Sequence, residues 1–346
     1  MLSFPFHTVC ITGGTGFFGQ ACLAYFRQHH PDVHIRIVSR HEYLQKQVME
    51  LFGEQNVSYL LGDVRDIDRL RLAFRGVDLV IHAAALKQVP AGEYNPSEFA
   101  QTNVNGTAHV SRACLDCGVQ KAILLSSDKA VHSQTLYGST KHLAERLFIQ
   151  ANSYSREDEC SFVCTRYGNV MGSRGSALEH FKEKLASAEP LPLTDQRMTR
   201  FWMSADEAIV LVLFAAKHAM RGEIFVPELP AFQMTDMLRA ILGLGEGDTL
   251  SPGQVETIGK RPGEKLHESL LSLDEIERCS VLSSHTSAVY VVQPMLHSWG
   301  QVREVSLTMP DDAILANQAE YSSQTWPWRL RVEDIRQRLQ VMGVIS

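Results

Sequence analysis

A glycine-rich turn directly behind the first apolar run constrains the fold of this chain more than any other feature. The run Thr8–Ile11 is short and rich in β-branched residues, and the segment Thr12–Gly19 that follows has glycine at positions 13, 14, 16 and 19. In a strand–turn–helix unit, such glycines form a dinucleotide-binding loop. We expect Gly13 to make the tight turn, Gly16 to let backbone amides approach a pyrophosphate, and Gly19 to let the helix pack closely on the sheet.

Strand and helix patterns alternate through the first 165 residues. The predicted strands are 8–11, 35–38, 57–61, 79–83, 122–125 and 161–165, and the predicted helices are 19–29, 43–52, 67–74, 99–117 and 136–152. This alternation predicts an α/β protein with a Rossmann-type doubly wound parallel sheet, covered on both faces. Residues 1–168 are expected to form an NADP-binding Rossmann domain with the catalytic helix. Residues 169–346 are expected to form a smaller mixed substrate-binding lobe and tail, from which some segments can return to the sheet.

Composition excludes several classes of protein. The chain has 346 residues, 45% of them hydrophobic, and a net charge of −6, which argues against general nucleic-acid binding. No apolar run approaches the ~18 residues that span a bilayer, and the start of the chain lacks a basic region and a cleavage site. We therefore expect a cytoplasmic protein without a membrane partner. The seven cysteines are expected to be reduced, and the pair Cys114 and Cys117 is expected to pack on a helix face rather than bind a metal.

The end of the second predicted strand bears on the choice of cofactor. It reads Val38-Ser39-Arg40-His41, without the acidic residue typical of NAD-binding folds. A hydroxyl followed by arginine suits a 2′-phosphate, so NADP is favoured, while Glu42 keeps NAD open. Asp63, after the third strand, is the candidate acceptor for the adenine amino group. The cofactor-binding residues expected from the whole pattern are Thr12, Gly13, Thr15, Gly16, Phe17, Phe18, Ser39, Arg40, Asp63, Val64, Ala83, Ala84, Lys87, Asn103, Tyr137 and Lys141.

A catalytic constellation follows the fifth predicted strand. Tyr137 and Lys141 are spaced i, i+4 and so share one helix face. A phenol with a pKa near ~10 is a poor base at neutral pH, and a nearby ammonium together with a positive nicotinamide would lower that pKa. This combination resembles the extended short-chain dehydrogenase/reductase superfamily, in which the preceding strand supplies a Ser or Thr, here Ser127, that hydrogen-bonds the reacting hydroxyl. Asp128 and Lys129 add an acid and a base beside a ketone-forming site, which suits elimination.

Seven phrases occurring in order make the resemblance more specific. They are His82–Pro90, Asn95–Pro96, Thr102–Thr107, Ser127–Val131, Arg166–Ser176, Met198–Phe201 and Arg261–Glu268. They resemble the inverting UDP-N-acetylglucosamine 4,6-dehydratases that begin pseudaminic-acid and related bacterial glycan pathways, over residues 8 to about 280. The sequence departs from that family at Ser127, where threonine is usual, at Gly92, where alanine is usual, and in the loop 132–135. The segment 280–309 has no counterpart that we can place.

The resemblance implies roles for individual residues. Tyr137 would remove the C4 hydroxyl proton, Lys129 would take the C5 proton, and Asp128 would protonate the departing C6 hydroxyl; the sequence does not divide the proton transfers between Tyr137 and Lys129. Hydride would return to C6, and reprotonation from the opposite face would invert C5, giving a 4-keto-6-deoxy sugar of L-arabino configuration. Lys141 would hold the nicotinamide ribose. The residues implied for the UDP-sugar are Lys87, Asn169, Ser176, Thr194, Arg197, Arg200, Arg261 and Glu264, and guanidinium groups suit phosphate oxygens.

Two alternatives stay open. A nucleotide-sugar 4-epimerase would share Tyr137, Lys141 and the cofactor but would need no acid–base pair for elimination. A catalytically inactive NADP-binding regulatory protein would usually have lost the tyrosine or the lysine, and both are present here. Relatives of this kind assemble as homo-oligomers, and the resemblance implies the same for this chain.

Overall fold

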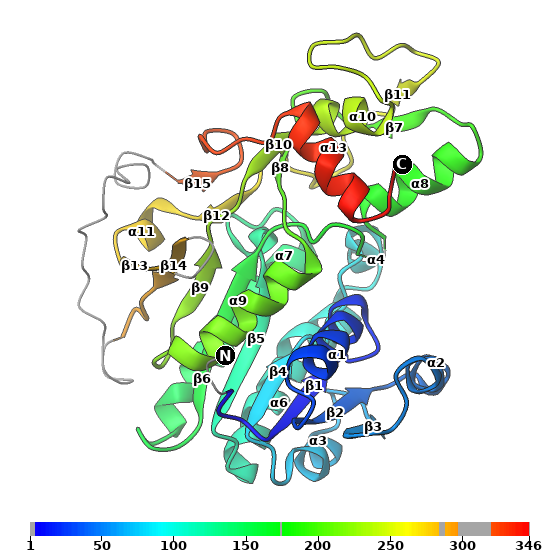
Figure 1. The fold of residues 1–346 in the computed structure, drawn as a ribbon. Helices are drawn as coiled ribbons and strands as arrows, with labels where there is room; N and C mark the ends of the chain where they lie inside the picture. Colours follow the sequence, from blue (N-terminus) through cyan, green and yellow to red (C-terminus); the bar gives the residue numbers. More distant parts are fainter. Residues whose placement is uncertain (1–3, 174, 284–287, 297–319, 346) are drawn as a thin grey trace.

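The computed structural model describes residues 4–173, 175–283, 288–296 and 320–345, and its central element is a sheet of nine strands (Figure 1). The strand order is β13-β14-β9-β6-β5-β4-β1-β2-β3, and every neighbouring pair from β9 to β3 is parallel. The bounds are β1 Thr8–Thr12, β2 His34–Ser39, β3 Val57–Leu61, β4 Leu79–His82, β5 Lys121–Ser127, β6 Ser161–Tyr167, β9 Ile224–Pro227, β13 Cys279–Ser283 and β14 Ala288–Val292. The predicted doubly wound α/β fold and its six N-terminal strands are therefore confirmed.

Helices cover both faces of this sheet. α1 (Phe17–His29) and α9 (Ala205–His218) pack together on one face, and α3 (Ile67–Phe74), α6 (Gly106–Cys117) and α7 (Leu136–Gln150) pack side by side on the other. α2 (Glu42–Phe52) lies beside α1 and β3. Strands buried on both faces consist of nearly continuous apolar residues, which explains why β1, β4 and β5 could be predicted from short apolar runs.

The predicted helix 99–117 is not a single α-helix. The structure has a short α5 (Pro96–Phe99), a π-helical segment (Ala100–Asn105) and then α6. A π-helical turn inserts an extra residue per turn and often lies at a functional site. Here the π-helical turn directs the side-chain amide of Asn103 toward the loop after β4. The amide accepts a hydrogen bond from the Leu86 N–H and donates one to the Leu86 carbonyl. An apolar periodicity of 3.6 cannot show such an insertion.

A smaller lobe lies above the carboxyl ends of the strands (Figure 1). It contains α8 (Ala177–Ala186), α10 (Met234–Ile241), α13 (Val332–Val341) and the two-stranded pairs β8–β10, β7–β11 and β12–β15. The strand bounds are β7 Leu191–Leu193, β8 Thr199–Phe201, β10 Ala231–Gln233, β11 Val255–Thr257, β12 Ser269–Leu271 and β15 Tyr321–Ser322. A separate apolar cluster, including Trp202, Phe232 and Ile335, forms its core.

The chain crosses more than once between the sheet and this lobe. α9 and the strands β9, β13 and β14 follow residue 169, yet they pack on or join the large sheet. Most of β13 and all of β14 come from the segment 280–309 that the sequence could not place, and residues 284–287 and 297–309 of that segment lie outside the described part of the chain.

A buried arginine fastens the catalytic helix to the lobe. Arg166 of β6 is 1% exposed and makes paired hydrogen bonds of 2.8–3.0 Å with Glu145 of α7 and of 2.8 Å with Glu275. Glu275 belongs to α11 (Leu273–Ile276), and the same guanidinium also donates to the carbonyl of Leu270 in β12. Planar paired bonds of this kind fix geometry as well as charge. Arg166 therefore sets the position of the helix that carries Tyr137 and Lys141 relative to the lobe.

Candidate active site

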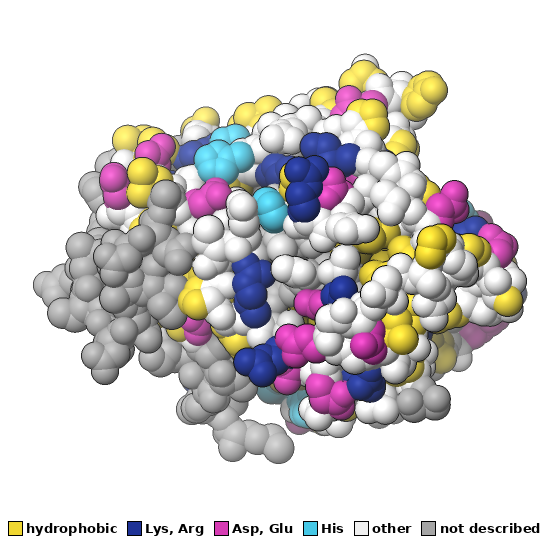
Figure 2. All heavy atoms as spheres, turned by 90° about the horizontal axis from the view of Figure 1, so that it is seen from above, with side chains coloured by type: hydrophobic (Ala, Val, Ile, Leu, Met, Phe, Trp, Pro, Cys, Tyr) yellow, Lys and Arg dark blue, Asp and Glu magenta, His cyan; other side chains and the backbone are white. Residues whose placement is uncertain are grey.

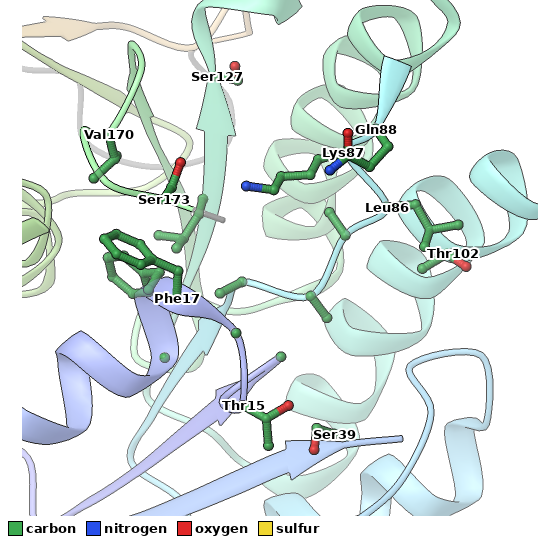
Figure 3. A pocket seen from close by; sticks show the side chains of 18 of the residues that line it. Thr15, Phe17, Ser39, Leu86, Lys87, Gln88, Thr102, Ser127, Val170 and Ser173 are labelled. Carbon is green, nitrogen blue, oxygen red and sulfur yellow. The ribbon is translucent and has the colours of Figure 1, made fainter. Parts of the chain in front are cut away.

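A cavity of about 600 Å³ opens at the carboxyl ends of β1, β2, β4, β5 and β6 (Figure 3). Its centre is the point between β1 and β4 where the strand order reverses, the usual ligand position in doubly wound sheets. Of the residues expected to bind cofactor or substrate or to act in catalysis, those lining this cavity are Gly13, Thr15, Gly16, Phe17, Phe18, Ser39, Arg40, Asp63, Val64, Ala83, Ala84, Lys87, Ser127, Lys129, Tyr137, Lys141, Asn169 and Ser176. The side chain of Lys87 extends across the cavity toward Ser173 (Figure 3).

The turn between β1 and α1 forms a cradle from which side chains are excluded. Gly13 has a φ of +72°, and a Cβ added to it would lie 2.8 Å from the backbone of Ala84. A Cβ on Gly19 would lie 2.4 Å from Gly14, so the helix could not approach the strand as closely. The first residues of α1 line the cavity, and a helix N-terminus attracts phosphate. The cradle therefore fits the pyrophosphate of a dinucleotide, and both steric expectations from the sequence are confirmed.

Two expected cofactor residues at the adenosine end already have partners. Ser39 is buried, and its hydroxyl accepts a hydrogen bond of 2.9 Å from Gln45 of α2. The Asp63 carboxylate pairs with Arg65 at 2.7 Å. Burial opposes ionisation of Asp63, but the hydrogen bonds from Arg65 outweigh it and lower the pKa of this carboxyl group. Arg40 is exposed and lines the cavity beside them.

Thr12 and Asn103 lie behind the cavity wall rather than on it. The Thr12 hydroxyl lies 2.7 Å from Nδ1 of His82, whose Nε2 lies 3.1 Å from the Thr107 hydroxyl. Because the Thr107 hydroxyl donates to the Asn103 carbonyl, His82 must donate from Nε2 and accept at Nδ1. Burial, followed by the charge of Lys141, lowers the pKa of His82 to about 3. This row of uncharged, hydrogen-bonded groups ends at the backbone of Ala84, whose amide donates to the Thr12 hydroxyl at 3.4 Å.

The end of β5 and the start of α7 bring the catalytic candidates together. Lys141 is buried and donates a hydrogen bond of 2.6 Å to the carbonyl of Leu125. Burial lowers the pKa of Lys141 to about 8, although the charge of Glu145 opposes the shift. Burial and the charge of Asp128 raise the pKa of Tyr137 above its ordinary value, and the charge of Lys129 and a hydrogen bond with Ser127 offset only part of this shift. The ammonium that acts on the phenol is thus that of Lys129 and not the expected Lys141.

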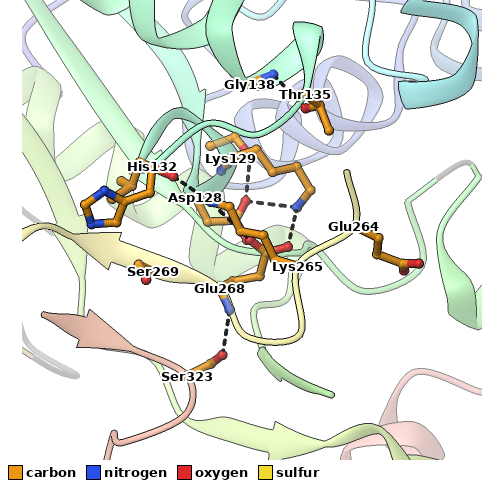
Figure 4. Close-up of polar contacts among 12 residues, drawn as sticks. Asp128, Lys129, His132, Thr135, Gly138, Glu264, Lys265, Glu268, Ser269 and Ser323 are labelled. Atoms are coloured by element: carbon orange, nitrogen blue, oxygen red, sulfur yellow. Dashed lines mark hydrogen bonds and ion pairs between the residues drawn. The ribbon is translucent and has the colours of Figure 1, made fainter. Parts of the chain in front are cut away.

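Asp128 and Lys129 form an ion pair at the edge of the cavity (Figure 4). They lie on a short 3₁₀ turn, Asp128–Ala130, directly after β5. The Asp128 Oδ1 accepts hydrogen bonds from the Ser127 hydroxyl at 2.7 Å and from the Lys129 ammonium at 3.0 Å. Lys129 lines the cavity, whereas Asp128 is fully buried behind it. The acid is therefore reached from the cavity through Ser127 and Lys129.

Two further charged residues join this pair and were not assigned a role from the sequence. Glu268 Oε1 lies 3.5 Å from the Lys129 amine, and the Lys265 amine lies 4.0 Å from Glu268 Oε2. Both residues belong to the phrase Arg261–Glu268, which was used for the resemblance. Its two charges at spacing i, i+3 were the available signal, but no sequence pattern shows that this segment folds back onto the turn after β5.

The remaining substrate candidates lie outside the cavity, in the lobe. Arg200 is buried and lies 3.7 Å from Glu264, whose carboxylate accepts a hydrogen bond of 3.1 Å from the Arg261 amide.

The other two candidates in the lobe have separate partners. Arg197 is exposed and pairs with Asp195 at 2.7 Å, and the Thr194 hydroxyl donates a hydrogen bond to the sulfur of Met198. The structure thus brings Arg200, Arg261 and Glu264 together, while Arg197 extends into solvent. Seen from above, Lys and Arg side chains gather near the middle of this face, with acidic and histidine side chains among them (Figure 2).

Membrane-spanning helices and metal-binding clusters are absent from the described residues. No helix among them is both long and apolar enough to cross a bilayer. The described parts of the chain also hold no group of three or more His, Cys, Asp or Glu side chains arranged to bind a metal. Cys114 is buried, and the Cys117 thiol donates to the carbonyl of Arg71.

This chain is similar in sequence to proteins named as nucleotide-sugar dehydratases and epimerases. The inverting UDP-N-acetylglucosamine 4,6-dehydratase of Campylobacter jejuni (serotype O:23/36, strain 81-176) is 40% identical over 300 residues, covering 86% of each chain. A protein of Rickettsia bellii (strain RML369-C) named UDP-glucose 4-epimerase is 39% identical over 281 residues, covering 80% of this chain and 81% of its own.

Among solved structures, Pen from Bacillus thuringiensis superposes with a TM-score of 0.85 and 31% identity, covering all of both chains. The dTDP-glucose 4,6-dehydratase DesIV of Streptomyces venezuelae, solved with NAD, shares the fold with a TM-score of 0.66 and 22% identity, covering 75% of this chain and 86% of its own. The family model described as Polysaccharide biosynthesis protein matches residues 9–290. The chain therefore belongs to this polysaccharide biosynthesis family, within the extended short-chain dehydrogenase/reductase type of fold.

Proposed function

We propose that this chain is a nucleotide-sugar 4,6-dehydratase that acts on UDP-N-acetylglucosamine with inversion at C5. The observation that carries the proposal is the Asp128–Lys129 ion pair at the cavity edge, next to Ser127 and Tyr137. An oxidoreductase that only exchanges a hydroxyl for a ketone has no need of such a pair. The identity to the Campylobacter enzyme supports the same substrate.

A nicotinamide bound in this cavity would supply the hydride chemistry at C4 and C6 of the sugar. Tyr137 takes the proton of the C4 hydroxyl, and Ser127 orients that hydroxyl. The C4 ketone makes the C5 proton acidic, so Lys129 can remove it while Asp128, which is buried behind the cavity wall, protonates the departing C6 hydroxyl through the Ser127 hydroxyl. Lys141 holds the cofactor ribose. Arg200, Arg261 and Glu264 hold the nucleotide part of the sugar donor, and Asn169 and Ser176 meet its diphosphate.

The test is incubation with UDP-N-acetylglucosamine in deuterated water without added cofactor. We expect a product that has lost one water and carries deuterium at C5, detected by mass spectrometry and NMR. An unchanged sugar would reject this substrate and direct the assay to UDP-glucose and other nucleotide sugars.

The second candidate is a nucleotide-sugar 4-epimerase, which the name of the Rickettsia relative favours. The same experiment separates the two reactions, because epimerisation leaves the mass unchanged. An inactive regulatory protein would bind nucleotide and release no altered sugar.

For the cofactor we propose NADP, held at its 2′-phosphate by Arg40. Replacing Arg40 with alanine is expected to weaken NADP binding by about 10-fold or more, since a hydrogen bond to a charged group contributes about 1.5–3 kcal/mol, and to leave NAD binding unchanged. Calorimetric titration of cofactor-stripped protein measures both. Lys46→Ala is the control, because Lys46 is an exposed cation on neighbouring α2 that pairs with Glu50. A wild-type protein that prefers NAD, or equal losses for both nucleotides, would reject the assignment.

The resemblance also supports a role in cytoplasmic synthesis of pseudaminic-acid-type glycans by a homo-oligomer. Light scattering of the purified chain tests the assembly directly.

A further inference from the structure

A second carboxylate faces the proposed base from the lobe. Glu268 is 3% exposed and lies directly before β12. Its backbone is fixed by a reciprocal pair of hydrogen bonds with Ser323, in which the Glu268 amide donates to the Ser323 hydroxyl at 2.9 Å and the Ser323 amide donates to the Glu268 carbonyl at 2.8 Å. The side chain is thereby held with Oε1 3.5 Å from the Lys129 amine (Figure 4).

The polar atoms of this cluster are incompletely satisfied. Glu268 Oε2 and Asp128 Oδ2 are both buried, and neither has a hydrogen-bond partner among the described residues. An unsatisfied buried carboxylate oxygen is costly, and such atoms in a native fold call for an explanation. The Lys265 amine, which lies 4.0 Å from Oε2, donates instead to the Val131 carbonyl at 2.6 Å. Glu268 is therefore buried, and among the described residues Lys129 is its nearest cation.

We propose that Glu268 is a positioning residue of the dehydration site, which holds the Lys129 amine at the cavity edge through their opposite charges. This inference rests on the proposed function.

The proton balance shows what the Lys129 amine, which Glu268 holds in place, does during the reaction. Lys129 can act as a base only after its ammonium proton has moved to Asp128, across the 3.0 Å hydrogen bond between them. Lys129 then takes the C5 proton, the C5–H electron pair forms the C5–C6 double bond, and the C6–O bond breaks as Asp128 passes its proton to Ser127 and the Ser127 hydroxyl gives its own proton to the departing hydroxyl. Water leaves, and the ion pair of Asp128 carboxylate and Lys129 ammonium is restored. Glu268 faces the Lys129 amine, with Oε1 3.5 Å away.

Other charged and titratable groups also face Lys129, so the expected pH dependence must account for each of them. They come from the loop after β4, the 3₁₀ turn, α7, β8 and the segment before β12, and they are Lys87, Asp128, Tyr137, Arg200, Lys265 and Glu268. Burial by itself lowers the pKa of Lys129, and Arg200 lowers it further, but the carboxylates of Asp128 and Glu268 outweigh both and raise it. The reaction requires the one proton that Lys129 and Asp128 share across their hydrogen bond. Loss of this proton from Lys129 at high pH therefore sets the basic limit of activity.

The experiment compares Glu268→Gln with the wild-type enzyme over a range of pH. We expect kcat to fall by about 10-fold or more, because the Lys129 amine is no longer held at the cavity edge. The basic limb of the pH profile should move to lower pH by about one unit or more, because an opposite charge has been removed within 4 Å of the amine. KM for the sugar should change little. Glu268→Asp, which keeps the charge, should restore part of both effects. Lys265→Met removes a cation from the far side of Glu268 and should not move the limb to lower pH.

A second measurement does not depend on turnover. The rate at which an amine-reactive reagent labels Lys129 in substrate-free protein, followed by peptide mass spectrometry across pH, should show a lower pKa for Lys129 in Glu268→Gln. An unchanged labelling profile and an unchanged basic limb would overturn the proposal. A wild-type enzyme that releases no dehydrated sugar, but shows the labelling shift, would instead reject the proposed function and leave the Glu268–Lys129 coupling intact.

Discussion

Replacing Lys129 with alanine is expected to abolish release of the dehydrated sugar, with a loss of about 10²–10⁴-fold in kcat, the usual contribution of a positioned general base. Of the two residues in the Asp128–Lys129 pair, only Lys129 lines the cavity. The Asp128 carboxylate therefore cannot replace its amine as the base that acts on C5. The variant should still bind cofactor and UDP with wild-type affinity. The measurement is water loss by mass spectrometry, together with deuterium exchange at C5.

The Asp128→Asn variant tests the proton transfer within the Asp128–Lys129 pair. It should lose both deuterium exchange at C5 and water release, because Lys129 becomes a base only after its ammonium proton has moved to the Asp128 carboxylate. Lys129→Ala should also lose both. Lys182→Ala, an exposed lysine on α8, is the matched control. Full dehydration by Lys129→Ala would remove this residue from the mechanism and leave Tyr137 to carry both proton transfers.

Replacing Arg166 with methionine is expected to lower the free energy of unfolding by about 3–5 kcal/mol. The substitution leaves two buried carboxylates, Glu145 and Glu275, without their shared cation, and breaking a buried ion pair from one side has this cost. The midpoint and slope of denaturant unfolding measure it. Arg156→Met is the control: its side chain is 85% exposed and faces Glu159 at 4.0 Å, so the loss should be below about 1 kcal/mol.

The same variant has a distinct pH signature. Burial by itself raises the pKa of Glu275, but the charge and hydrogen bonds of Arg166 lower it from its ordinary value of 4.5 to about 2. In the wild-type chain, the stabilisation by this carboxylate is therefore complete above pH 4.5 and is lost as the pH falls toward 2. In Arg166→Met only the Ser272 amide and the charge of Arg278 still oppose the effect of burial on the pKa of Glu275, so the variant loses less stability than the wild type as the pH falls. The difference in the free energy of unfolding between the wild-type chain and Arg166→Met should narrow as the pH falls below 4.5. A difference that stays constant with pH would contradict the ion-pair account.

Elements with a strong local pattern could be predicted closely. Val57–Leu61 and Ile67–Phe74 have the predicted bounds, because a short apolar strand or an amphipathic helix is defined by its own residues. The glycine turn was equally accessible, since the positive φ of Gly13 and the close approach at Gly19 are requirements of the backbone itself. The π-helical segment at Asn103 was not, because its extra residue is stabilised by contacts with the loop after β4.

The candidate site divides in the same way. Ser127, Asp128, Lys129, Tyr137 and Lys141 lie within fifteen residues of one another on one strand, one turn and one helix, so their sequence spacing already places them at one end of the sheet. Glu268 and Lys265 reach Lys129 only because a segment more than a hundred residues later folds back onto that turn. Thr12 and Asn103 were assigned to the cofactor, whereas the structure places them behind the wall that the cofactor would touch.

The sequence by itself determined the parallel sheet, the phosphate cradle and the pairing of a tyrosine with an acid and a base, because each has a characteristic pattern among residues near one another in the chain. Only the tertiary structure decided which charges surround Lys129 and how the lobe is fastened to the catalytic helix through Arg166. Electrostatic effects depend on distance and burial in space, and these are fixed only when distant segments have packed together.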